Sequence, residues 1–87
     1  MAEETQIIHV LIAEDSSDDA LLIVYELKTA GFQVLAERVQ TAQELERALS
    51  AKSWDIVLSD YSMPQYTAND VLKAVKRKNP DLPCMVI

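Results

Sequence analysis

Four short apolar runs alternate along the chain with three longer segments in which apolar residues recur every three or four positions. Runs of the first kind predict buried strands, and the spacing in the longer segments predicts amphipathic helices. The predicted strands are His9 to Ala13, Phe32 to Val39, Asp55 to Ser59 and Leu82 to Ile87. Strict alternation of strand and helix implies right-handed crossovers and a parallel sheet with helices on both faces. The pattern therefore predicts a three-layer, doubly wound α/β domain.

Polar caps and a glycine mark the ends of the predicted helices. The start of the first helix is marked by the oxygens and negative charge of Ser16, Ser17, Asp18 and Asp19. The helix runs to about Ala30, where Gly31 is a natural stop. Thr41 and Glu44 form a capping box, in which each side chain satisfies a backbone amide of the other residue, and this box opens the second helix. The third helix is bounded by Thr67 and by the pair Asn79 and Pro80.

The apolar positions of the helices predict which residues reach the core. These are Ala20, Leu21, Val24, Leu27 and Tyr25 in the first helix, Leu45, Ala48 and Leu49 in the second, and Val71, Leu72 and Val75 in the third. The strand from Phe32 to Val39 carries Glu37 and Arg38 near its end, which indicates an exposed position. We therefore expect this strand at an edge of the sheet.

Acidic residues follow two of the predicted strands. Glu14 and Asp15 come directly after the first strand, and Asp60 comes directly after the third. Because ligands collect beyond the carboxyl ends of parallel strands, we expect these three carboxylates to converge. Clustered carboxylates repel one another unless a cation lies among them. Magnesium (Mg2+) fits best, since it is usually held by one or two carboxylates plus waters and leaves positions for phosphate oxygens.

The acidic pair and the Asp-x-x-Met-Pro turn from Asp60 to Pro64 resemble the receiver domain of two-component response regulators, which has a flavodoxin-like fold. The resemblance implies that Asp60 accepts a phosphoryl group from a sensor histidine kinase or a phosphotransfer protein. It also implies that Glu14, Asp15, Asp60 and the backbone carbonyl of Ser62 hold Mg2+. Glu14 stands where the family more often has Asp. Such a domain is a signalling module, and we therefore do not expect this protein to be an enzyme.

The resemblance covers essentially the whole chain but only part of the family's domain. After the fourth strand, a complete receiver has a Ser or Thr that contacts the phosphoryl group, a further helix, a fifth strand that ends in a Lys, and a last helix. Residues 1–87 are therefore interpreted as one receiver domain, incomplete at its C-terminus, without the last strand and helices. A smaller departure is Ala68, at a position where the family usually has Gly.

Charge and composition argue against nucleic acid and membrane as partners. The formal net charge of -6 argues against a nucleic-acid surface, which needs a basic stripe. The basic residues gather at the end of the third helix, where they suit the helix dipole: Lys73, Lys76, Arg77 and Lys78. The single cysteine, Cys84, forms no internal disulfide, and no charged leader or long apolar span is present. We expect a cytoplasmic protein without direct nucleic-acid or membrane contact.

Other interpretations stay open beside the receiver. In one alternative, Asp60 only caps a turn, and Glu14 and Asp15 are ordinary acids at the start of a helix. A phosphatase of the haloacid dehalogenase type needs a second Asp two positions after its nucleophile, which the sequence following Asp15 does not supply. The main alternative is a degenerate or truncated receiver that serves only as an interaction or dimerisation module. Without a fifth strand, Leu82 to Ile87 is an apolar edge, so we expect a homodimer formed through it.

Overall fold

The computed structural model describes residues 7–60, 63 and 66–87, and it contains the predicted alternation of strands and helices. The elements are β1 (Ile7–Ala13), α1 (Ser17–Thr29), β2 (Gln33–Val39), α2 (Ala42–Ala51), β3 (Ile56–Ser59), α3 (Ala68–Lys78) and β4 (Cys84–Val86). Strand β1 begins two residues earlier than predicted. Strand β4 is shorter than predicted, because Leu82 belongs to a turn in which its amide donates to the carbonyl of Asn79.

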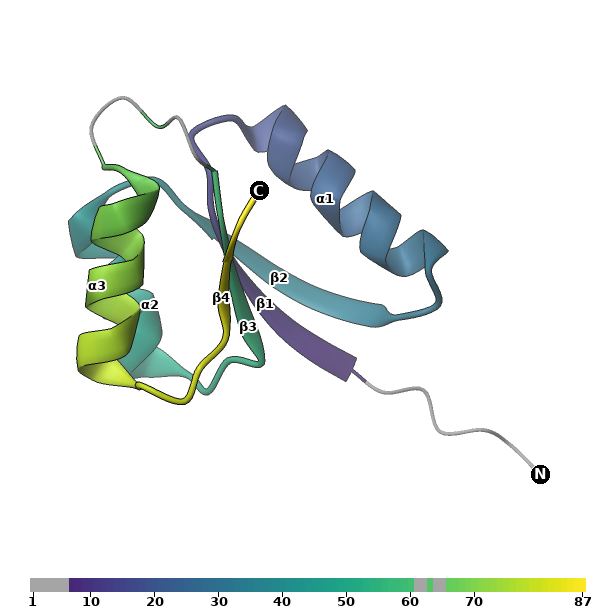
Figure 1. Cartoon of the computed structure of the whole chain (residues 1–87). Coiled ribbons are helices and arrows are strands. Elements are labelled where there is room, and N and C mark those ends of the chain that lie inside the picture. Colours follow the sequence, from purple (N-terminus) through teal and green to yellow (C-terminus); the bar gives the residue numbers. More distant parts are fainter. Residues whose placement is uncertain (1–6, 61–62, 64–65) are drawn as a thin grey trace.

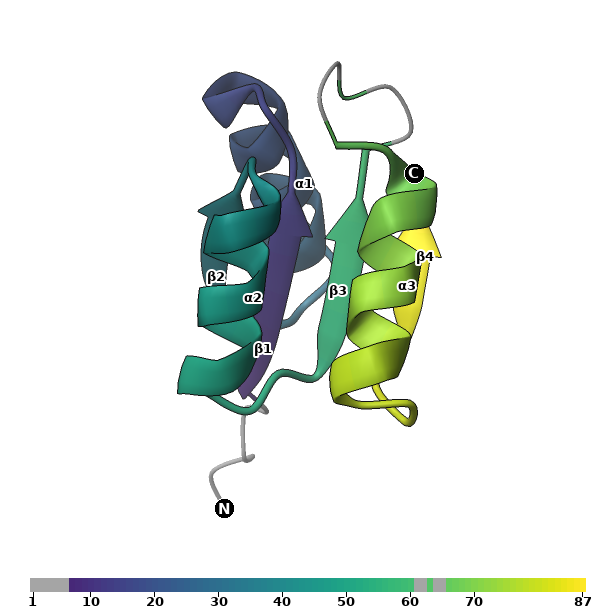
Figure 2. The same ribbon diagram turned by 90° about the vertical axis from the view of Figure 1, so that its left-hand side faces the viewer.

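The four strands form one parallel sheet in the order β2-β1-β3-β4. Helix α1 covers one face of the sheet, and α2 and α3 lie side by side on the other (Figures 1 and 2). This arrangement confirms the three-layer α/β fold. It also confirms that β2 is an edge strand, and among the described residues β4 forms the opposite edge.

Two apolar clusters hold the layers together. The larger one lies between the sheet and the pair α2 and α3, and its fully buried side chains include Leu11, Leu45, Val57, Val71 and Val75. The smaller one lies beneath α1 and contains Val10, Ile12, Ala20, Val34 and Leu58. Burial on this scale, at roughly 1.5–3 kcal/mol for each fully buried aliphatic side chain, is the main term that favours the fold.

The predicted core face of α1 is wrong for two residues. Leu21 and Tyr25 are 65% and 68% exposed, although both were expected to pack inward. The helix turns by about 100° per residue, so the face that contacts the sheet is the one shared by Ala20, Val24 and Leu27. Leu21 and Tyr25 lie about 100° and about 140° around the helix from Ala20, outside that face. In α3, Leu72 is only half-buried.

Side-chain hydrogen bonds start the helices where the sequence predicts, with one difference in the second helix. The side chains of Ser16 and Thr41 accept from the backbone amides three residues on, at 3.2 Å and 3.1 Å. The carboxylate of Glu44 accepts from Gln40, one residue before the cap, and so the second helix has only half of the predicted capping box. Gly31 has φ +104°, in the left-handed region that favours glycine, and it turns the chain from α1 into β2. Within the described residues, no helix is long and apolar enough to cross a membrane.

Candidate functional site

The sheet topology brings the three predicted acids together. Strands β1 and β3 are neighbours, with Ala13 opposite Ser59, so the residues after them leave the sheet at the same edge. The backbone amide of Asp60 donates to the carbonyl of Ala13 at 2.9 Å, which joins the two turns directly. One carboxylate oxygen from each of Glu14, Asp15 and Asp60 lies within 4.8 Å of the other two. The predicted convergence of these acids is confirmed.

Glu14 is the buried member of the acidic cluster. Only 4% of the residue is exposed, and its Oε1 accepts a hydrogen bond from the backbone amide of Ser16 at 3.1 Å. Burial raises the pKa of the Glu14 carboxyl above its ordinary value, and hydrogen bonding to Asp15 and the charges of Asp60 and Asp19 raise it further, although the Ser16 amide opposes them. Burial is the main reason why the charged form of Glu14 is disfavoured, and the neighbouring acids add to it.

The other two acids face solvent. Asp15 is exposed and Asp60 is half-buried, so the cluster is closed to solvent on the side of Glu14 and open to solvent on the side of Asp15. Three carboxylates at this spacing offer hard oxygen ligands and leave room for waters, which is the donor set that suits Mg2+. The backbone carbonyl of Ser62, a further predicted ligand, lies outside the described residues. Met63, three residues after Asp60, is buried in the apolar cluster under α2 and α3.

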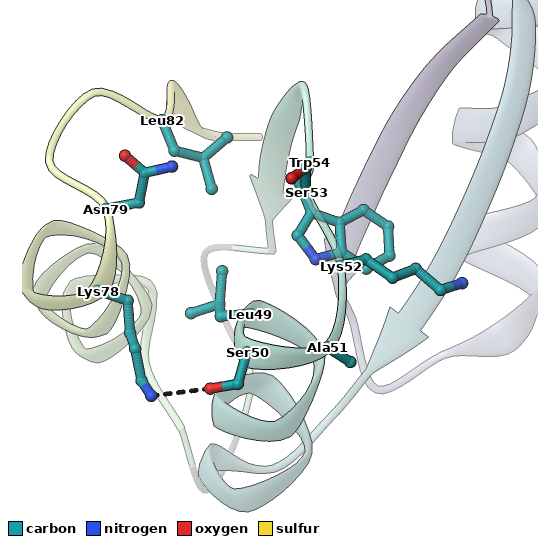
Figure 3. A pocket seen from close by; sticks show the side chains of 9 residues that line it. All are labelled: Leu49, Ser50, Ala51, Lys52, Ser53, Trp54, Lys78, Asn79 and Leu82. Carbon is teal, nitrogen blue, oxygen red and sulfur yellow. Dashed lines mark hydrogen bonds between the residues drawn. The ribbon is translucent and has the colours of Figure 1, made fainter.

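A separate cavity of about 650 Å³ lies at the other end of the fold, between the end of α2 and the turn that precedes β4 (Figure 3). Its cations already have partners within the chain. Lys78 Nζ donates to Ser50 Oγ at 2.8 Å, and Lys52 Nζ lies 3.6 Å from Glu37 and 5.6 Å from the centre of a Trp54 ring. We therefore place the candidate functional site at the acidic cluster and not in this cavity.

Sequence reasoning missed one residue beside the acids. Arg38, read from the sequence only as a sign of an exposed strand, donates from Nη1 to the backbone carbonyl of Glu14 at 3.2 Å. The strand register explains this contact: Arg38 of β2 stands opposite Ile12 of β1, and Ile12 is two residues before Glu14. That register becomes visible only once β1 and β2 are paired.

Replacing Glu14 by glutamine is expected to stabilise the metal-free protein as the pH rises. Because the pKa of Glu14 is raised in the folded state, the stability linked to its neutral form is complete below the ordinary carboxyl pKa and is lost as the pH passes the raised value. Glutamine keeps an acceptor for Ser16 and carries no charge. The difference in free energy of unfolding between Glu14→Gln and the wild type should therefore grow as the pH rises above the ordinary carboxyl pKa of 4.5, measured by urea denaturation without divalent ions.

The matched control for this variant is Glu26→Gln, which removes the same charge from an exposed position on α1. Its free energy of unfolding should follow that of the wild type across the same range. Equal pH dependence for the Glu14 and Glu26 variants would contradict the raised pKa of Glu14.

Curated relatives share the sequence over most of this chain. The DNA-binding transcriptional regulator NtrC of Rhizobium meliloti is 32% identical over 78 residues, which is 90% of the chain and 16% of NtrC. The two-component response regulator ORR3 of Oryza sativa is 36% identical over 72 residues, which is 78% of the chain and 51% of ORR3. The chain thus spans about one sixth of the NtrC proteins and about half of ORR3.

Solved structures have the same fold. The receiver domain of the sensor histidine kinase PA1611 from Pseudomonas aeruginosa PAO1, a structure with a magnesium ion coordinated in its active site cleft, superposes with a TM-score of 0.75 at 16% identity and covers 93% of this chain and 66% of its own. The beryllofluoride-activated NtrC receiver domain superposes with a TM-score of 0.72 at 27% identity, and covers 95% of this chain and 65% of its own.

The family comparison agrees with these relatives and structures. The sequence profile of the response regulator receiver domain matches residues 10–87, which include all strands and helices except the first residues of β1. The same span contains the acidic pair and Asp60. The chain therefore belongs to the response regulator receiver domain family.

Proposed function

We propose that this receiver accepts a phosphoryl group on Asp60 from a histidine kinase or a phosphotransfer protein, with Mg2+ held by Glu14, Asp15 and Asp60. The observation that carries the proposal is the convergence of the three carboxylates within 4.8 Å at the ends of β1 and β3. The structural neighbour with magnesium in its active site cleft supports the choice of ion. Ser62 completes the proposed ligand set through its backbone carbonyl.

The chemistry proposed for Asp60 is a direct phosphoryl transfer. One carboxylate oxygen of Asp60 forms a bond to phosphorus while the bond from phosphorus to the donor's histidine nitrogen breaks, and the electron pair of that bond returns to the imidazole. The product is an acyl phosphate on this chain. Because Asp60 is half-buried and its amide is tied to Ala13, the side chain is both reachable and positioned. When bound, Mg2+ supplies positive charge that offsets the negative charge gathered at the site.

The phosphoryl group stays on the chain that receives it, so we regard the domain as a signalling module and not as an enzyme.

We propose that the phosphoryl transfer takes place in the reducing cytoplasm. Cys84 is a free, half-buried thiol whose pKa is raised by burial, and it would stay unmodified there. Fractionation of cells that express the tagged protein tests this location, and recovery in an oxidising compartment would refute it.

The test of the proposed function is covalent labelling by a small phosphodonor. The purified chain is incubated with acetyl phosphate and Mg2+, and its intact mass is measured. The expected result is one added phosphoryl group per chain, which is lost in mild base and does not appear when EDTA replaces Mg2+. A chain that remains unlabelled with Mg2+ present would refute the proposal and favour a domain that acts only through protein contacts.

That second function, an interaction module, has one observation in its favour. Strand β4 pairs with β3 on one side, and among the described residues no strand lies on its other side. The apolar residues at this edge are largely open to solvent, with Met85 55%, Val86 40% and Ile87 50% exposed. An apolar strand edge of this kind favours the addition of another strand.

The chain is accordingly expected to form a symmetric dimer through the β4 edge. Light scattering across a dilution series from high to low micromolar concentration should show a falling apparent mass. Val86→Lys should shift the population toward monomer, because a charge at a strand edge opposes pairing. The control is Leu35→Lys, a similarly exposed position on the opposite edge strand β2. A wild-type chain that is monomeric throughout the series would rule out this dimer.

A further inference from the structure

Residues at the end of β2 bind the backbone of Glu14, which precedes Asp15 in the turn after β1. The backbone amide of Glu14 donates to the carbonyl of Val39 at 3.0 Å. The carbonyl of Glu14 accepts from Nη1 of Arg38 at 3.2 Å, and the same nitrogen also donates to Oε1 of Gln40 at 3.2 Å. Both polar backbone groups of Glu14 are therefore bound to residues of β2, the amide to Val39 and the carbonyl to Arg38.

The carbonyl that Arg38 binds sets the direction of Asp15. A peptide unit is planar, so the carbonyl oxygen of Glu14, the amide of Asp15 and the Cα atom of Asp15 lie in one plane. Fixing the oxygen at the guanidinium fixes the rotation of that plane. The side chain of Asp15 is exposed, and it reaches the other two carboxylates only when its Cα atom is correctly placed.

Arginine suits this task because its donors are held in a rigid plane. Nη1 donates to two acceptors, the backbone carbonyl of Glu14 and the side chain of Gln40. The second acceptor holds the guanidinium in place while the first holds the peptide. A lysine at this position would keep the charge, but its flexible stem and compact ammonium lack the planar fork.

We propose that Arg38 is a positioning residue for the metal site: through the carbonyl of Glu14 it orients the Glu14–Asp15 peptide so that both carboxylates face Asp60. The inference rests on the proposed Mg2+ binding and adds to it a residue from a third strand. It predicts that Arg38 governs the affinity for the ion while the rest of the fold does not depend on it. Arg38 is itself exposed, so its replacement removes little packing from the core.

The experiment is a titration with Mg2+ alone, followed by backbone amide shifts of Asp15 and Asp60. Arg38→Gln is expected to weaken Mg2+ binding by about tenfold or more, as the loss of an outer-shell partner commonly does. Its Asp15 amide should shift even without the ion, while amides inside β1 such as that of Val10 should not. Arg38→Lys should recover only part of the affinity.

The matched control is Arg77→Gln, which removes the same charge from α3, where the guanidinium pairs with Glu46 at 2.8 Å. Its Mg2+ affinity should equal that of the wild type. Wild-type affinity in Arg38→Gln would overturn the inference. Full recovery in Arg38→Lys would show that a flexible donor serves equally well, and would overturn the role of the planar guanidinium in positioning the peptide. If Arg38→Gln folds poorly, Gln40→Ala tests the same arrangement by releasing the guanidinium, and unchanged affinity there counts equally against it.

These outcomes are separable from a failure of the proposed function. If the wild-type chain itself shows no response to Mg2+, the proposed metal site is wrong and the role of Arg38 falls with it. If the wild type binds Mg2+ and the Arg38 variants bind it equally well, only the inference about Arg38 is wrong.

Discussion

Asp60→Asn is expected to abolish labelling of the chain by acetyl phosphate. The substitution replaces the carboxylate with an amide of nearly the same shape, so the side chain still fits but no longer offers a charged oxygen to phosphorus. The fold should be kept, because the contact that joins the two turns uses the backbone amide of Asp60, which asparagine retains. Intact-mass measurement should show no added phosphoryl group in this variant under conditions that label the wild type fully.

The control for Asp60→Asn is Asp55→Asn at the opposite end of the same strand. The carboxylate of Asp55 accepts from the backbone amide of His9 at 2.7 Å, and asparagine preserves that acceptor. This variant should be labelled as fully as the wild type. Undiminished labelling of Asp60→Asn would show that another side chain is the acceptor.

The second large effect is expected for Asp15→Asn, which should weaken Mg2+ binding by at least about tenfold, since the loss of an outer-shell partner alone commonly costs that much. The exposed carboxylate of Asp15 is one of three anionic ligands within reach of the ion, and an amide offers only a neutral oxygen. The titration is followed by backbone amide shifts of Ala13 and Asp60. Trp54 fluorescence is a poor reporter, because Trp54 precedes β3 and lies at the opposite end of that strand from Asp60.

Asp18→Asn is the matched control for the loss of charge at Asp15. Asp18 lies in the first turn of α1, three residues further along the chain, and is exposed in the same way. Its replacement should change Mg2+ affinity only slightly, because it is not part of the cluster whose oxygens lie within 4.8 Å. If Asp15→Asn and Asp18→Asn weaken binding equally, the ion responds to general negative charge and the ligand role of Asp15 is wrong.

The sequence by itself determined the order of the elements, the helix starts and the acids at the strand ends. Thr41 and Thr67 each accept from the backbone amide three residues on, as predicted. Ser16, one of the four residues predicted to start the first helix, does the same. These signals are reliable because capping and hydrophobic periodicity depend on near neighbours in the chain. The convergence of the acids was predictable for a related reason: strict alternation of strand and helix leaves a parallel sheet, whose carboxyl ends share one edge.

Only the tertiary structure decided how wide a strip of α1 is covered, where β4 begins to pair and what Arg38 binds. Leu21 and Tyr25 share the apolar character of the buried residues, but a single helix against a sheet buries one narrow face, and the spacing alone does not give the width of that face. The hydrogen bond from Arg38 to Glu14 joins residues 24 positions apart. It depends on the register between β1 and β2, which is set when the apolar residues of both strands pack against the same helix.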